Sequence, residues 1–210
     1  MNVFVLNTGR CGSTTFIEAC RHITNYSAAH ESKTGRLGPA RLRFRRNHIE
    51  ADNRLSWFLG RLDRTYGDAA FYVHLRRDPA AVAASYARRH RAGIMAAYRR
   101  GILMGVRPEV LPERVAEDYC ETVTRNIECF LKDKSRQMDF HLETAKDDFR
   151  RFWQLIGAQG DLPAALAEFD IHHNAARARP EPRPPPPLPR RAIGKLRRVV
   201  GKLPRFLSEA

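Results

Sequence analysis

Residues 3–15 read VFVLNTGRCGSTT and join a short apolar run to a glycine turn and a row of hydroxyl side chains. The run Val3–Leu6 contains no polar residue, which is typical of a strand buried on both faces of a parallel sheet. A helix pattern follows from Ser13 to about residue 22, with Phe16 and Ile17 on its apolar side. The sequence therefore predicts a strand, a tight turn and a helix in direct succession.

The turn between this strand and this helix has the chemistry of an anion site. The first backbone N–H groups of a helix have no partners within it, and the helix dipole adds partial positive charge there. Gly9 and Gly12 allow the backbone to curl around an oxyanion, the hydroxyls of Ser13–Thr15 add donors, and Arg10 adds a cationic fork. We therefore expect an anion-binding loop; the alternative is a strand–helix turn that needs glycine and binds nothing.

Cys11 lies inside this loop, and we expect it to contribute only its backbone N–H. A helix N-terminus can also lower the pKa of a thiol, so a reactive Cys11 is the alternative. The four cysteines of the chain form no CxxC pair and have no histidine at ligand spacing, which argues against a zinc site. A reducing cytoplasm is the simplest compartment for such a chain.

Strand and helix patterns alternate along the rest of the chain. Residues 25–46 are polar and basic and are predicted to be loop, while apolar side chains recur at helical spacing between His48 and Tyr66, after a cap at Asp52 or Asn53. Further elements are predicted as a strand at 69–75, a helix starting at Asp78-Pro79, a helix at 112–132, a half-exposed strand at 138–142 and a helix at 149–156. This alternation predicts an α/β three-layer sandwich with a mostly parallel central sheet.

The charge of the chain is unevenly distributed. Its 210 residues include 37 Lys and Arg against 23 Asp and Glu, a formal charge of +14, and residues 176–210 hold ten basic residues, two acidic ones and eight of the thirteen prolines. We predict one α/β domain at residues 1–175 and a Pro-rich basic tail at 176–210, either disordered or a short amphipathic helix suited to an anionic membrane surface. No apolar stretch reaches the ~20 residues of a membrane span, and the N-terminus does not read as a signal peptide.

Two motifs resemble those of bacterial sulfotransferases that use 3′-phosphoadenylyl sulfate (PAPS). Loops of that family read like GRSGTT or GRSGST after the first strand, and residues 9–15 read GRCGSTT. The second family motif is a strand ending in Arg-Asp-Pro with a serine eight residues after the arginine; here Arg77 stands before Asp78-Pro79, and Ser85 follows at that spacing. The resemblance covers residues 1–175 and implies a P-loop NTPase-like sulfotransferase fold.

The resemblance also implies an activity, namely transfer of a sulfonate from PAPS to a hydroxyl or amine of an acceptor, with no metal. It assigns the 5′-phosphosulfate to Arg10, Cys11, Gly12, Ser13, Thr14 and Thr15, and the 3′-phosphate to Arg77 and Ser85. Negative charge grows on the leaving phosphate oxygen during such a transfer, so prepositioned positive charge stabilises it. Arg10 is the residue expected to do so.

The acceptor needs a base, and family members place a glutamate or histidine downstream of the first helix for this purpose. In this sequence His30 and Glu31 stand at that place. Glu31 is our first choice and His30 our second, with Glu50 and Asp52 third. The alternative is that His30 and Glu31 are polar surface residues without a catalytic role.

Other functions compete with this interpretation. A P-loop kinase-like enzyme is disfavoured because Ser13 follows Gly12 where a lysine is required. Such an enzyme also needs an acidic residue after a strand to complete a magnesium site. The candidate here, Asp78, is expected to cap a helix instead. A catalytically inactive anion-binding module, or a membrane-binding module that uses the tail, would keep the fold without the chemistry. Aromatic residues are sparse among the basic residues of the tail, which disfavours nucleic acid. The acceptor, whether glycan, lipid or small metabolite, and the oligomeric state are left open.

Overall fold

The computed structural model describes residues 1–171 of the chain. The predicted domain boundary at residue 175 and the basic tail at 176–210 therefore lie outside the described residues. Within residues 1–171, no helix combines the length and the apolar character that crossing a bilayer requires.

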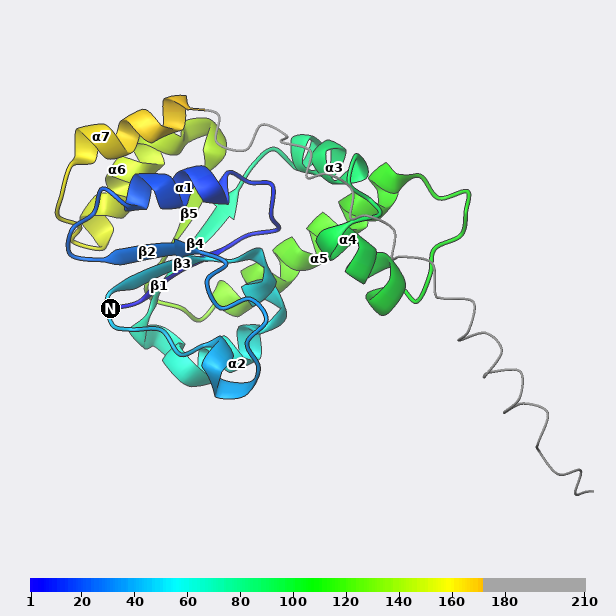
Figure 1. Ribbon diagram of the computed structural model, residues 1–210, viewed down its shortest axis with the longest axis horizontal. Helices are drawn as coiled ribbons and strands as arrows, with labels where there is room; N and C mark the ends of the chain where they lie inside the picture. Colours follow the sequence, from blue (N-terminus) through cyan, green and yellow to red (C-terminus); the bar gives the residue numbers. More distant parts are fainter. Residues whose placement is uncertain (172–210) are drawn as a thin grey trace, which may run out of the picture. The chain divides into compact units, whose positions relative to one another are not determined.

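A five-stranded parallel sheet forms the centre of the protein (Figure 1). Its order is β2-β3-β1-β4-β5, and each neighbouring pair is parallel. The strands are β1 (Val3–Leu6), β2 (Ser27–His30), β3 (His48–Ala51), β4 (Phe71–Arg76) and β5 (Gln137–His141). The predicted α/β class with a parallel sheet is confirmed.

Helices cover both faces of this sheet (Figure 1). On one face lie α1 (Ser13–Cys20), α6 (Ala145–Leu155) and α7 (Leu162–Ala167), and on the other α2 (Leu59–Tyr66) and α5 (Pro112–Leu131). The helix α3 (Pro79–Ala87) packs against α5, and α4 (Gly93–Ala97) continues into a π-helical turn, Tyr98–Ile102. Short 3₁₀ turns occur at Gly38–Arg41, Asn53–Trp57, Gly67–Ala69, Leu142–Thr144 and Glu168–Asp170.

Aromatic side chains fill the space between each helical layer and the sheet. On the α1 and α6 side, the ring of Phe16 lies 5.0 Å from that of Phe140 and 5.1 Å from that of Phe152. On the α2 and α5 side, the Phe4 and Tyr66 ring centroids are 4.7 Å apart. Edge-to-face and tilted pairs at such separations add to the stabilisation from area burial, so β1 is held from both faces as its apolar run predicts.

The order of the strands places a topological switch point, here called the crevice, at the carboxyl ends of β1 and β4. From β1 the chain passes through α1 to β2 on one side, and from β4 it passes through α3 and α5 to β5 on the other side. Right-handed crossovers in opposite directions place their helices on opposite faces, which leaves a gap beyond the carboxyl ends of the two strands. Ligands of open α/β sheets bind at this position.

Two strands occur where the sequence did not predict them. Residues 25–46 were expected to be loop but contain β2, and the stretch from His48 begins with β3 before any helix. Both strands are four residues long, and polar side chains contact one another between the strands and along β3. Ser27 Oγ lies 2.8 Å from His48 Nδ1, and His48 Nε2 lies 2.9 Å from Glu50 Oε2. Because these polar groups satisfy one another, the strands need no apolar run.

Candidate anion site at the crevice

The loop after β1 turns tightly enough that two of its positions require glycine. Gly9 and Gly12 both have φ near +85°, a region that side chains disfavour. A Cβ on Gly9 would lie 2.1 Å from the Tyr86 hydroxyl oxygen, and one on Gly12 would lie 2.6 Å from a methyl carbon of Leu142. Arg10 also has a positive φ, of 62°, so the surrounding contacts hold it in a strained conformation.

Neutral hydrogen-bonding side chains, two donors and one acceptor, fix the start of this loop. The hydroxyls of Tyr86 and Tyr119 donate to the carbonyl of Thr8 at 2.6 and 2.8 Å, and Asn7 Oδ1 accepts from the Gly9 N–H at 2.7 Å. Burial raises the pKa of both tyrosines far above the usual value, so both remain protonated donors. Tyr119 carries no sequence signal for this role, because it belongs to α5 and reads only as part of that helix's apolar stripe.

The two sequence motifs meet at the crevice. Arg10 Nε donates to Ser85 Oγ at 3.0 Å, although the two residues are 75 positions apart. Arg77 Nη1 donates to the Arg10 carbonyl at 3.2 Å. The loop after β1 and the strand–helix junction after β4 therefore form one continuous surface. Asp78 caps α3 as predicted, accepting from the N–H groups of residues 80 and 81.

This surface carries positive charge that the protein itself does not neutralise. Among residues 1–171, neither Arg10 nor Arg77 forms an ion pair with a carboxylate. The positive charges of Arg88 and Arg89 also repel that of Arg10. Burial, and after it the charge of Arg89, lowers the pKa of Arg10 below its usual value. Like charges gathered without a counter-charge repel one another, so a bound anion would relieve this repulsion.

Cys11 does not have the reactive character that the helix N-terminus suggested. Its thiol is buried, lies 3.2 Å from Thr8 Oγ1 and donates to the Gly9 carbonyl at 3.3 Å. Burial raises the pKa of the Cys11 thiol, and this effect exceeds the opposing one of the hydrogen bonds from Thr8. Cys11 thus packs inside the loop, which leaves its backbone as the part suited to a ligand.

His30 and Glu31 lie at the carboxyl end of β2, near the loop. His30 Nε2 is 3.0 Å from Ser13 Oγ at the first turn of α1, so the second-choice base already has a partner in the loop. Glu31 has a positive φ of 52°, and its Oε2 is 2.7 Å from Arg54 Nη1, with both side chains about one-third exposed. Glu31 is thus accessible, and its carboxylate is held in place by an arginine.

The third-choice carboxylates, Glu50 and Asp52, are fully buried and structural. Glu50 accepts from the N–H and the hydroxyl of Ser32, both at 2.6 Å, and contacts His48. Asp52 pairs with the buried Arg41 and accepts from the Arg54 N–H at 2.9 Å. These contacts use the carboxylate oxygens inside the protein and leave none directed at a ligand.

Comparison with known proteins agrees with this architecture. No family model and no curated protein matches the chain. Among solved structures, the chain is similar to a sulfotransferase domain from the curacin biosynthetic pathway, with a TM-score of 0.56 and 14% sequence identity over 81% of this chain and 78% of that one.

The chain has a sulfotransferase fold. The predicted P-loop-like sulfotransferase fold is confirmed. The roles of Arg10–Thr15, Arg77 and Ser85 in binding stay predictions. Within residues 1–171, no three His, Cys, Asp or Glu side chains are grouped so that they could hold a metal ion.

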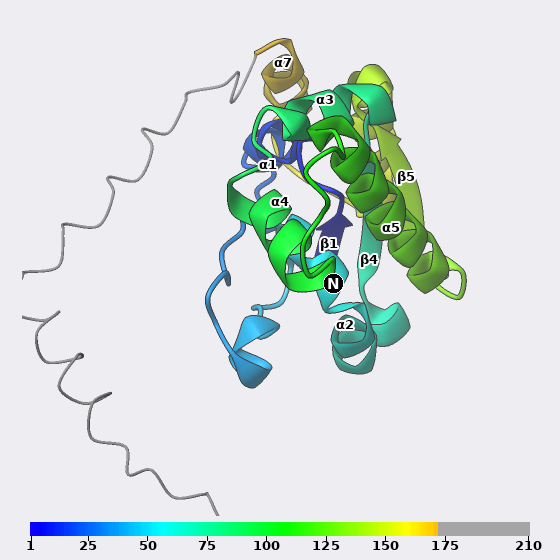
Figure 2. The same ribbon diagram turned by 90° about the vertical axis from the view of Figure 1, so that its right-hand side faces the viewer.

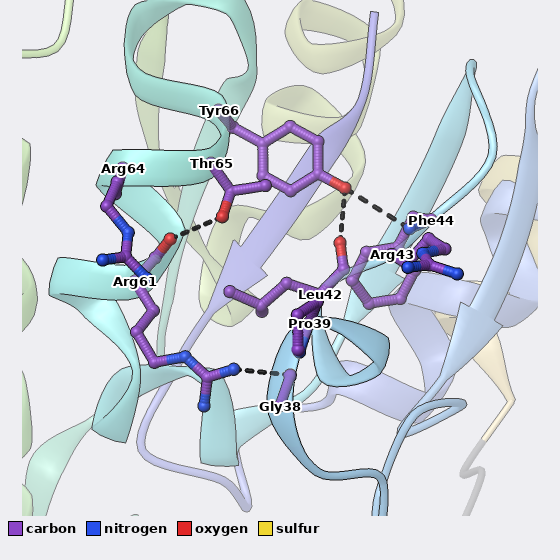
Figure 3. Close-up of a pocket in the computed structure, with 9 residues that line it drawn as sticks. All are labelled: Gly38, Pro39, Leu42, Arg43, Phe44, Arg61, Arg64, Thr65 and Tyr66. Atoms are coloured by element: carbon purple, nitrogen blue, oxygen red, sulfur yellow. Dashed lines mark hydrogen bonds between the residues drawn. The ribbon is translucent and has the colours of Figure 1, made fainter.

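A separate cleft of the sulfotransferase-like domain lies away from these residues (Figure 3). It has a volume of about 510 Å³ and lies between α2 and residues 38–44. Tyr66 Oη donates to the Leu42 carbonyl and accepts from the Phe44 N–H, and Arg61 donates to the Gly38 carbonyl (Figure 3). The cleft shares no lining residue with the loop after β1. It is therefore a different site from the candidate anion site.

Proposed function

We propose that this protein transfers a sulfonate group from PAPS to a hydroxyl or amine of an acceptor. The observation that carries the proposal is the contact of Arg10 with Ser85 and Arg77 at the crevice, where the two arginines have no carboxylate partner within residues 1–171. A donor with an anionic group at each end matches two adjacent cationic segments. The sulfotransferase fold supports this choice over other phosphate-bearing ligands.

The loop after β1 would bind the 5′-phosphosulfate of PAPS. The N–H groups at the start of α1 and the side chain of Arg10 would lie against the bridging oxygen, which gains negative charge as the sulfur–oxygen bond breaks. Arg77 and Ser85 would bind the 3′-phosphate and fix the orientation of the donor. Ser13, Thr14 and Thr15 would supply hydroxyl donors along the same turn.

The acceptor would enter beside Glu31. Its oxygen or nitrogen attacks the sulfur, the bond from sulfur to the phosphate oxygen breaks, and adenosine 3′,5′-bisphosphate leaves. The acceptor proton passes to the Glu31 carboxylate, which is accessible, whereas Glu50 and Asp52 are buried and paired. His30, at 3.0 Å from Ser13, would position that hydroxyl. A cytoplasmic location is part of the same proposal, because the four cysteines are free, as is usual in a reducing compartment.

A panel of glycan, lipid and small-molecule acceptors, incubated with PAPS and examined by mass spectrometry, tests the proposal. We expect a sulfonated product that Arg10→Ala lowers by roughly 10²–10³-fold. Arg150→Ala is the matched control, since the Arg150 guanidinium pairs with Asp147 on the exposed side of α6. Binding of adenosine 3′,5′-bisphosphate without any sulfonated product would identify an inactive binding module instead. Stronger binding of ATP with magnesium would favour the kinase-like alternative.

A further inference from the structure

Exposed apolar side chains gather between α4 and α5. The exposed fractions are 53% for Ile102, 83% for Met104 and 63% for Leu111, and Leu103 and Val110 are exposed as well. Of the nine large hydrophobic side chains exposed within residues 1–171, these five fall within ten positions. A concentration of this kind marks an interaction surface, whereas single exposed apolar residues are ordinary.

The same segment is strongly cationic. Between Asp78 and Glu109 the sequence contains six arginines and no acidic residue. The arginines are Arg88, Arg89, Arg91, Arg99, Arg100 and Arg107, and all except the half-buried Arg99 are exposed. The partner of this surface therefore carries negative charge next to an apolar region.

The local backbone holds the apolar side chains outward. The Leu103 N–H donates to the Tyr98 carbonyl at 2.9 Å, and the Gly105 N–H donates to the Arg99 carbonyl at 2.9 Å, which closes the turn that carries residues 102–104. Tyr98 is buried and donates through its hydroxyl to Asp118 on α5, which anchors the turn to the domain. In Figure 1 the stretch between α4 and α5 extends away from the sheet, and Figure 2 shows it on the side of α3 and α5.

We propose that residues 88–111 form a docking surface for an anionic lipid bilayer. Ile102, Leu103 and Met104 enter the interface between head groups and acyl chains, and the arginines contact lipid phosphates. Membrane attachment of this type combines an apolar insertion with electrostatic attraction, and residues 88–111 provide both. A second copy of this chain would bring two sets of six arginines together, and nucleic acid would leave the apolar side chains without a partner. The proposal concerns a surface separate from the tail and does not depend on sulfonate transfer.

The test places a fluorophore at the turn in the full-length chain. Cys129 is exposed, while Cys11, Cys20 and Cys120 are buried, so Cys129→Ser combined with Met104→Cys allows selective labelling with an environment-sensitive dye. Leu155→Cys on α6, also an exposed apolar position, provides the matched control. Both proteins are mixed with vesicles of phosphatidylcholine alone or of phosphatidylcholine with phosphatidylglycerol.

We expect a blue shift of the dye at position 104, but not at position 155, with the anionic vesicles. In an unlabelled protein, I102S/L103S/M104S should weaken co-sedimentation with these vesicles at least tenfold, and R100Q/R107Q, at two exposed arginines, should weaken it about fivefold for each arginine. The proposal is overturned if the protein sediments while the dye at position 104 is unchanged, because the tail would then be the membrane anchor. An equal shift with neutral vesicles would also overturn it, as would a shift that grows with protein concentration in the absence of lipid.

Discussion

Two regions of the sheet differ in how their charged side chains are paired. One is the crevice after β1 and β4, and the other is the β2–β3 edge. At the crevice the buried partners are neutral: two tyrosine hydroxyls and the Asn7 amide hold the loop, and in the described part of the chain no carboxylate pairs with Arg10 or Arg77. At the β2–β3 edge the buried carboxylates have partners inside the protein, Asp52 with Arg41 and Glu50 with Ser32. The difference indicates that the arginines at the crevice are available to an anionic ligand, whereas Glu50 and Asp52 are not, because their oxygens are used inside the protein.

The sharpest comparison is between Glu31, which follows β2 and is about one-third exposed, and Glu50, which is buried on β3. Glu31→Gln should lower the rate of sulfonate transfer by roughly 10²–10⁴-fold, the range for loss of a general base, and change the free energy of unfolding by less than about 0.5 kcal/mol. Glu50→Gln should destabilise the protein by about 1–3 kcal/mol, because its bonds to Ser32 and His48 are disturbed. Turnover assays and urea unfolding of both variants measure these effects. Equal losses of activity at equal stability would contradict this division of roles.

The crevice loop should be intolerant of any side chain at Gly9. Gly9→Ala should destabilise the protein by about 2–4 kcal/mol, because the added Cβ would overlap the Tyr86 hydroxyl at a positive φ. Gly35→Ala separates the two causes, since Gly35 has φ near +80° with open space around it and should cost about 1 kcal/mol. Thermal unfolding of the two variants provides the measurement. If they prove equally stable, the contact of Gly9 with Tyr86 does not shape the loop.

Below the crevice, His74 on β4 should make stability depend on pH. Burial, and after it the charge of Arg76, lowers the pKa of His74 from 6.5 to about 4. The unfolded chain therefore binds a proton below pH 6.5 that the folded chain does not, and the stability present at neutral pH is lost as the pH falls toward 4.

Between pH 7 and pH 4, the free energy of unfolding of wild type should fall by up to about 3 kcal/mol more than that of His74→Gln. The exposed His141 supplies a control variant, His141→Gln, which should follow wild type. Urea unfolding at the two pH values compares the three proteins. Identical pH dependence in all of them would show that His74 becomes protonated in the folded state.

The sequence predicts the crevice better than the β2–β3 edge for a physical reason. The apolar run of β1, the glycines after it and the Asp78-Pro79 helix start are local signals, and each forms as expected. The strands β2 and β3 are stabilised by contacts such as Ser27 with His48, 21 residues apart, which exist only once the two strands lie side by side. The contact of Tyr119 with Thr8 spans 111 residues and leaves no local pattern.

Calorimetric binding of adenosine 3′,5′-bisphosphate and of adenosine 5′-monophosphate to wild type and Arg77→Ala tests the central claim most directly. The claim is that the loop at Arg10–Thr15 and the segment at Arg77–Ser85 hold opposite ends of one donor. The two segments are in contact, because Arg77 donates to the Arg10 carbonyl. We predict that removing the 3′-phosphate weakens binding to wild type by at least tenfold, or about 1.4 kcal/mol, and weakens binding to Arg77→Ala much less. Equal losses in the two proteins, or no binding of either nucleotide to wild type, would contradict the account.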